Sequence, residues 1–164
     1  MEVRCFVALG ANLGDPLATV KSAIETLRVL PQTRLGAVSS LYRTTPVGLA
    51  HQPDFINAVV EMFTVSPAPT FLQQLFAVEA HFGRRRSVKN APRTLDLDLL
   101  LYGDQTSTAP ELTLPHPRLH QRAFVLAPLA EIAPQLEIPG LGAVGELLAR
   151  CAGQHIERLD SPPA

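Results

Sequence analysis

Hydrophobic residues in this chain recur with two different periods, and the period of two residues predicts four strands. Alternation near the N-terminus predicts a strand that is buried on at least one face, carried by Val3, Cys5, Val7 and Leu9. A run rich in Val, Ser, Leu and Tyr predicts a second strand over 35–43, and a third over 55–65 is predicted from Ile56, Ala58, Val60 and Met62. A fourth, over 94–102, places four leucines on the face that we expect to pack against helices: Leu95, Leu97, Leu99 and Leu101.

A period of three to four residues predicts two long helices between these strands. Asp15 and Pro16 suit the N-cap and first position of a helix, whose apolar stripe is Leu17, Val20, Ile24 and Leu27. Pro31 ends it. A second helix begins between 66 and 70 and is followed by Gly83, a residue suited to the position after a helix end. Its stripe is Phe71, Leu75, Val78 and Phe82.

The order of these elements is β-α-β-β-α-β, which predicts an α+β fold of the ferredoxin-like kind, an antiparallel sheet with two helices on one face. Short helices are expected over 118–129 and 144–151, at the edge or on the other face of the sheet. With 164 residues, 46% of them hydrophobic and 18% charged, residues 1–164 are predicted to form one domain rather than a disordered chain.

Net charge and cysteine content exclude several classes of protein. A formal charge of −1 gives no overall field for nucleic acid or an acidic membrane, so any anion site must come from local clustering. The two isolated cysteines, Cys5 and Cys151, indicate a reducing compartment, and we expect a cytoplasmic protein. The N-terminal apolar run is too short for a signal peptide, and no stretch of about 18 apolar residues predicts a transmembrane helix.

Candidate chemistry lies in the fourth predicted strand. Asp96 and Asp98 share a strand face, about 6.6 Å apart between their Cα atoms at 3.3 Å rise per residue. Two carboxylates this close repel each other, and a pair of Mg²⁺ ions removes that cost. Just upstream, five cations suit the phosphates that Mg²⁺ commonly binds: Arg84, Arg85, Arg86, Lys89 and Arg93.

Simpler interpretations of the same residues stay open. The two aspartates could face water on an open sheet, the arginine run could be a solvated loop, and Arg93 could serve to neutralise Asp96. The glycine-rich stretch 10–15 is a turn before a helix rather than a phosphate cradle, and the chain has no G-x-x-x-x-G-K-[ST] motif.

Five motifs together resemble one family, the 6-hydroxymethyl-7,8-dihydropterin pyrophosphokinases of folate biosynthesis. They occur in the family's order and cover nearly the whole chain: ALGANLGDP (8–16), SSLYRTTPVG (39–48), QPDFINAVV (52–60), PRTLDLDLLLYG (92–103) and LTLPHPRLHQRAFVLAPLAEIAP (112–134). The resemblance implies transfer of pyrophosphate from ATP to the pterin hydroxymethyl group with release of AMP. It also implies two Mg²⁺ ions on Asp96 and Asp98, a ferredoxin-like fold and a cytosolic monomer.

The resemblance assigns roles to further residues. Pterin contacts are implied for Thr44, Thr45, Val47, Phe55, Asn57 and Phe124. ATP contacts are implied for Glu79, Arg84, Arg86, Arg93, Thr113, His116 and Arg122. The implied catalytic set is Arg84, Arg93, Asp96 and Asp98. Plain core packing is the alternative for the two phenylalanines, and the histidines expected at the surface are His51, His81, His120 and His155.

The chain departs from the family pattern at several positions. It has no Trp before the PRTLDLD motif, Thr45 replaces a proline, Phe76 replaces a glutamine and Glu111 replaces an arginine. Two other functions are alternatives: a non-catalytic ferredoxin-like module that binds RNA or senses a small molecule, and a regulatory relative without activity. An RNA reader needs stacking aromatics on the open sheet face, where this chain is predicted to place Asp96 and Asp98.

Overall fold

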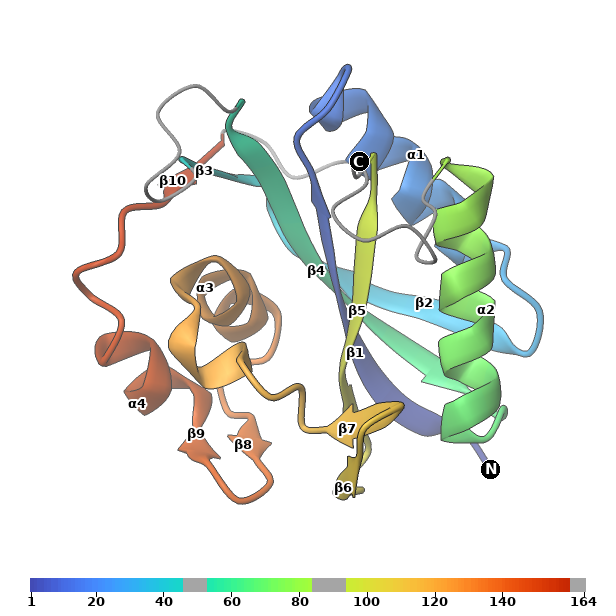
Figure 1. Cartoon of the computed structure of the whole chain (residues 1–164). Helices are drawn as coiled ribbons and strands as arrows, with labels where there is room; N and C mark the ends of the chain where they lie inside the picture. The colour runs from blue at the N-terminus through green and yellow to red at the C-terminus, as the bar shows by residue number, and fades with distance from the viewer. Residues whose placement is uncertain (46–52, 84–93, 160–164) are drawn as a thin grey trace.

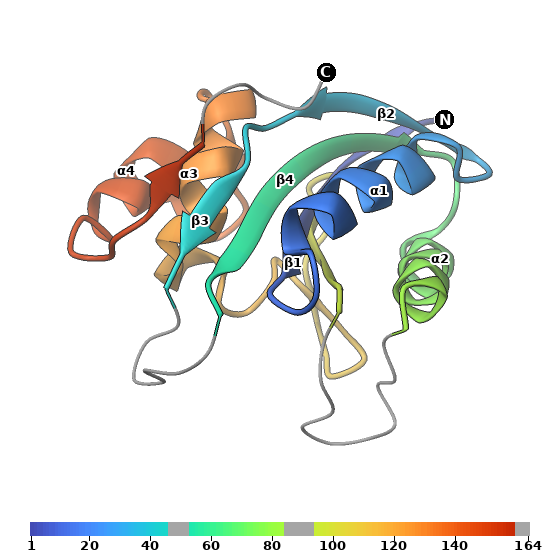
Figure 2. The same cartoon turned by 90° about the horizontal axis from the view of Figure 1, so that it is seen from above.

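A central antiparallel sheet carries helices on both faces (Figures 1 and 2). The computed structural model describes residues 1–45, 53–83 and 94–159. The sheet strands are β1 (Val3–Ala11), β2 (Thr33–Val38), β3 (Tyr42–Thr44), β4 (Phe55–Thr64), β5 (Asp96–Tyr102) and β10 (Glu157–Arg158). The helices are α1 (Pro16–Arg28), α2 (Ala68–His81), the 3₁₀ turn η1 (Leu119–Gln121), α3 (Ala123–Ile132) and α4 (Val144–Ala149). Two small ribbons are β6 (Ser107–Ala109) with β7 (Leu112–Leu114), and β8 (Glu137–Ile138) with β9 (Gly142–Ala143).

The strand order confirms the predicted ferredoxin-like fold. β1 lies between β4 and β5, and the far side of β4 pairs with both β2 and β3, all antiparallel. The crossing helices α1 and α2 connect β1 to β2 and β4 to β5, as the β-α-β-β-α-β order requires. β10, from the C-terminal part of the chain, adds an outer strand beside β3.

The predicted second strand is two strands in the structure. β2 ends at Val38 and β3 begins at Tyr42. Between them, the backbone N–H of Ser40 donates to the carboxylate of Glu131 on α3, at 3.0 and 3.1 Å, instead of to a strand. A single long strand over 35–43 was therefore wrong, because α3 supplies the hydrogen-bond acceptor at the break.

The first face of the sheet is covered by α1 and α2. Asp15 caps α1 by accepting from the N–H of Ala18 at 3.2 Å, as predicted. The buried stripe of α1 is Val20, Ala23, Ile24 and Leu27, while Leu17 at the edge of that stripe is exposed. Buried α2 residues Phe71, Leu75 and Val78 join the same core.

The leucines of β5 divide between the two faces. Leu95, Leu97 and Leu99 pack in the core under α1 and α2, as predicted. Leu101 packs in the opposite core together with Leu100, so its predicted face was wrong. The register of β5 against β1 shifts between Phe6 and Val7, and this bulge inserts one extra residue.

The second face is covered by α3 and α4, which confirms that the C-terminal helices pack against the sheet (Figure 1). The helix expected over 118–129 is η1 followed by α3, and the one expected over 144–151 ends at Ala149. Their core partners on the sheet are Phe6, Ala8, Val59, Leu100 and Leu101. Among the helices of the described ranges, none is both long and apolar enough to cross a membrane.

Candidate active site

Beyond the part covered by α3, the second face carries polar side chains of β4 and β5 on either side of β1. Gly10 of β1 pairs with Asn57 of β4 on one side and with Asp96 of β5 on the other. One step along, Ala8 pairs with Val59 and Asp98. A Cβ at position 10 would lie 3.2 Å from Asn57 Oδ1, so the glycine keeps the floor of this site low.

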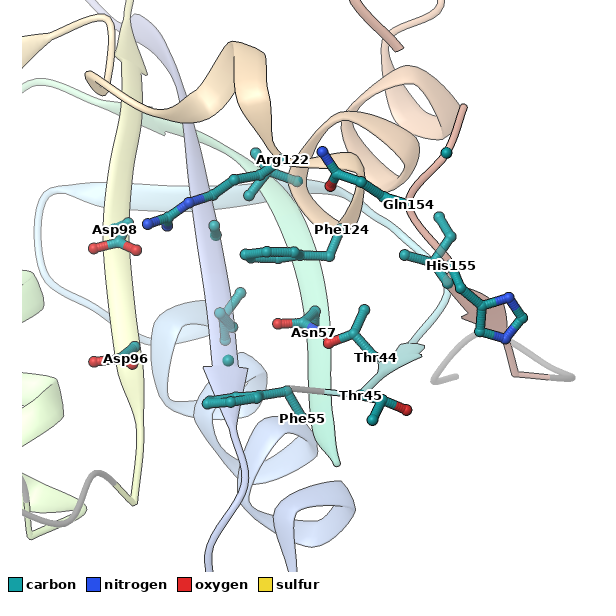
Figure 3. A pocket seen from close by; sticks show the side chains of 16 residues that line it. Thr44, Thr45, Phe55, Asn57, Asp96, Asp98, Arg122, Phe124, Gln154 and His155 are labelled. Carbon is teal, nitrogen blue, oxygen red and sulfur yellow. Dashed lines mark hydrogen bonds between the residues drawn. The ribbon is translucent and has the colours of Figure 1, made fainter. Parts of the chain in front are cut away.

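A cavity of about 540 Å³ lies above these residues (Figure 3). Its walls come from the sheet, from the start of α3 and from the C-terminal segment 153–156. The lining residues are Ala8, Leu9, Gly10, Thr44, Thr45, Phe55, Asn57, Asp96, Asp98, Arg122, Phe124, Val125, Gly153, Gln154, His155 and Ile156. Most of the residues assigned from the resemblance and described by the structure therefore meet in one cavity.

Two aromatic rings face each other across the cavity. Phe55 at the start of β4 and Phe124 in the first turn of α3 lie on opposite sides, with the amide of Asn57 between them (Figure 3). Both are half-buried rather than enclosed in the core. A planar ring inserted between them would stack on both faces.

Asn57 is held in one orientation. Its side chain is 5% exposed, and Nδ2 donates to Thr44 Oγ1 at 3.0 Å. The rest of the amide is available to the edge of a polar ring. Thr45 is exposed and its side chain points away from the rings (Figure 3), and Val47 lies outside the described residues.

Asp96 and Asp98 both reach the cavity from β5, which confirms that they share a face. From behind the strand, Glu79 of α2 accepts a hydrogen bond from the N–H of Leu97 at 2.7 Å. Glu79 is 1% exposed, so its carboxylate is part of the core and fixes the backbone between the two aspartates. It does not line the cavity, and its predicted contact with ATP stays a prediction.

Two further predicted ATP residues, Arg122 and His116, lie near Asp98. Arg122 extends toward Asp98, with its guanidinium carbon 5.5 Å from the centre of the Phe124 ring (Figure 3). His116 donates its backbone N–H to Leu100 O at 3.0 Å, at the bulge of β5. Burial lowers the pKa of the His116 imidazole, and the Asp98 carboxylate opposes that shift.

Thr113 of β7 is half-buried and donates its hydroxyl to Ala109 O at 3.0 Å. Neither Thr113 nor His116 lines the cavity. Arg84, Arg86 and Arg93 lie outside the described residues, so their predicted roles stay predictions.

The C-terminal wall of the cavity was missed by the sequence analysis. Gly153, Gln154 and Ile156 had no assigned role, and His155 was assigned to the surface. His155 is indeed exposed, and its imidazole points away from the cavity (Figure 3). This segment has no periodic hydrophobic pattern, because it is irregular in structure. It reaches the site because β10, which follows it, pairs with β3.

The two aspartates suit a magnesium ion that shares its shell with a ligand. Within the described ranges, no group of three or more His, Cys, Asp or Glu side chains could enclose a metal. Two carboxylates on one face beside an open cavity leave room for the water and phosphate oxygens that Mg²⁺ prefers. Asp96 and Asp98 are therefore the residues that could hold it.

Comparison with known proteins gives the same assignment as the motifs. A family model described as 7,8-dihydro-6-hydroxymethylpterin-pyrophosphokinase (HPPK) matches residues 6–134. A Pseudomonas aeruginosa protein named 2-amino-4-hydroxy-6-hydroxymethyldihydropteridine pyrophosphokinase is 46% identical over 159 residues, 97% of this chain and 98% of the relative. A Haemophilus influenzae protein of the same name is 36% identical over 158 residues, 96% and 99% of the two chains.

Solved structures share the fold. A crystal structure of Plasmodium falciparum wild-type HPPK-DHPS with pteroate matches with a TM-score of 0.71 at 12% identity, over 92% of this chain and 44% of that chain. This chain thus spans less than half of that longer protein, and the likeness concerns the fold. The family match, which covers most of the chain, and the near full-length relatives show that this chain belongs to the 7,8-dihydro-6-hydroxymethylpterin-pyrophosphokinase family.

Proposed function

We propose that this chain transfers pyrophosphate from ATP to the hydroxymethyl oxygen of 6-hydroxymethyl-7,8-dihydropterin and releases AMP. The observation that carries the proposal is one cavity with two chemically different ends. One end pairs Phe55 and Phe124 around the Asn57 amide, and the other presents Asp96 and Asp98. A flat, polar heterocycle suits the first end, and a metal-bound polyphosphate suits the second.

The aromatic end would bind and orient the pterin. Phe55 and Phe124 would stack on its two faces, while Asn57 reads the polar edge of the ring. The hydrogen bond to Thr44 fixes the amide before substrate arrives, which lowers the entropic cost of binding. With the polar edge of the ring on Asn57, the hydroxymethyl group would point toward the aspartates.

The acidic end would hold Mg²⁺ through Asp96 and Asp98. When bound, the ions would neutralise phosphate charge and increase the electrophilic character of the β-phosphorus. Glu79 keeps the backbone of β5 in place behind the two carboxylates. Arg122 extends toward Asp98, where a guanidinium can bind phosphate oxygens. By resemblance to the family, Arg84, Arg86 and Arg93 would contact ATP, and Arg84 and Arg93 would neutralise charge as AMP leaves.

The proposal includes a cytoplasmic monomer that acts on two small molecules. An RNA-binding module is disfavoured, because Asp96 and Asp98 stand on the open sheet face and repel a phosphate backbone in the absence of metal.

The test is to incubate the purified chain with ATP, Mg²⁺ and the reduced hydroxymethylpterin, and to separate the nucleotides. We expect AMP and a pyrophosphorylated pterin in equal amounts, with no product after chelation of the metal. Formation of ADP would contradict pyrophosphate transfer. Absence of any pterin product, from a chain with a cooperative unfolding transition, would contradict the proposed activity as a whole.

A further inference from the structure

One side chain in the C-terminal wall holds the backbone on both sides of Arg122. Gln154 Oε1 accepts from the N–H of Ala123 at 2.9 Å, and Gln154 Nε2 donates to the carbonyl of Gln121 at 2.8 Å. The amide therefore bridges the residues before and after Arg122. Both bonds have ordinary lengths. The amide oxygen accepts one and the amide nitrogen donates the other, so a single orientation of the side chain satisfies both.

These bonds lie at a sharp change in the chain. Gln121 ends η1, Arg122 is extended with φ −124° and ψ 107°, and α3 begins at Ala123. Arg122 is the N-cap residue of α3 but makes no capping hydrogen bond with its own side chain. The first N–H groups of a helix lack partners inside the helix. Gln154 supplies one from a distant part of the sequence and so fixes the angle between η1 and α3.

The segment fixed in this way carries two side chains of the site. Arg122 extends toward Asp98, and Phe124 forms one of the two aromatic walls (Figure 3). Because the guanidinium of Arg122 also lies over the Phe124 ring, a change of angle at Ala123 would move both. The two bonds of Gln154 thus act on the acidic end and the aromatic end of the cavity together.

Gln154 itself is anchored to the opposite wall. Three and four residues further on, β10 pairs with β3, which ends at Thr44. Arg158 of β10 donates to Ser40 Oγ at 3.0 Å and to Glu131 Oε2 at 3.2 Å. The backbone N–H of Leu159 adds a bond to Leu41 O at 2.9 Å. The C-terminal segment is therefore tied to β3 at one end and to the start of α3 at the other.

From these contacts we infer that Gln154 is a positioning residue, which holds Arg122 and Phe124 in the geometry needed for turnover without touching the reacting atoms. The expected loss of activity rests on the proposed function. The pair of hydrogen bonds around Arg122 does not depend on that function.

The test replaces Gln154 by Met, which keeps the length of the side chain and removes both hydrogen bonds. In the parent background we expect kcat/KM for the pterin to fall roughly tenfold, a smaller loss than the hundredfold that a displacement of about 1 Å can cause. In an Arg122→Ala background the same change should cost less than in the parent, because only its effect through Phe124 remains and residues that act through one another are not additive. Glu157→Gln is the matched control, since its exposed ion pair with Arg43 at 3.6 Å is expected to matter little.

Two outcomes would overturn the inference: no loss of kcat/KM in Gln154→Met, or an equal loss in both backgrounds. Amide hydrogen exchange separates this inference from the proposed function. Faster exchange of the Ala123 N–H in Gln154→Met supports the role of the side chain even if the parent shows no turnover. Unchanged exchange of that amide contradicts it, whereas an inactive parent contradicts the proposed function instead.

Discussion

The two faces of the central sheet use the same strands for different purposes. Under α1 and α2, β5 contributes Leu95, Leu97 and Leu99 to a continuous apolar core. On the opposite face, Phe6 and Ala8 of β1 join the core under α3, while β5 presents Asp96 and Asp98 to the cavity. The difference shows how a small fold makes a polar site: one face supplies the burial, and the uncovered end of the other carries the chemistry.

The largest expected effect concerns the aromatic end of the cavity, on the uncovered part of the sheet. Phe124→Ala should weaken binding of the reduced pterin roughly a hundredfold, because both stacking contact and apolar area are lost on one side of the ring. Calorimetric titration with the pterin measures this directly. Phe63→Ala is the control, since Phe63 lies near the far end of β4 beneath Arg34. Equal affinity in parent and Phe124→Ala would refute the stacked site.

A smaller effect concerns Glu79, the buried acid of α2 that supports β5 behind the two aspartates. Glu79→Leu leaves the N–H of Leu97 without its acceptor, and should lower the free energy of unfolding by about 2 kcal/mol. Urea denaturation measures the change. Glu25→Leu is the comparison, because its exposed pair with Arg28 at 3.2 Å is worth about 0.5 kcal/mol or less. Similar losses in the two variants would show that Glu79 does not support β5.

The smallest expected effect is a pH dependence of the free energy of unfolding that comes from Cys5 in the covered core. Burial raises the pKa of the Cys5 thiol from 9.0 to about 12. Above pH 9 the unfolded chain loses this proton while the folded chain keeps it, so the free energy of unfolding falls as pH rises. Denaturation between pH 8 and about 10 should show that slope in the parent and a flatter one in Cys5→Val. An identical slope would assign the alkaline loss to other groups.

Much of the covered face was predictable from the sequence, because its contacts follow local periodicity. The apolar stripes of α1 and α2 and the cap at Asp15 depend on residues close together in the chain. The shared face of Asp96 and Asp98 follows from strand geometry alone. Asn57 and the two aromatic rings, by contrast, were placed by resemblance to a family, and their meeting in one cavity depends on strand order and on α3.

The features that the sequence did not predict depend on contacts between distant segments. The break at Ser40 follows from the carboxylate of Glu131, and the altered face of Leu101 from a register shift against β1. Gln154 reaches the start of α3 across 31 residues. In each case the structure depends on a side chain or strand that is far away in the sequence. The local pattern of hydrophobic and polar residues therefore cannot predict it.

One strand presents Asp96 and Asp98 together to the cavity, and we propose that the two carboxylates bind ATP through magnesium. Calorimetric titration of ATP, with and without Mg²⁺, tests it in the parent, Asp96→Asn, Asp98→Asn and the control Asp104→Asn, which changes an exposed carboxylate just beyond β5. We expect metal-dependent binding in the parent and in Asp104→Asn, and a loss of at least about a hundredfold in the two site variants. Undiminished metal-dependent binding of ATP in either site variant would contradict the claim.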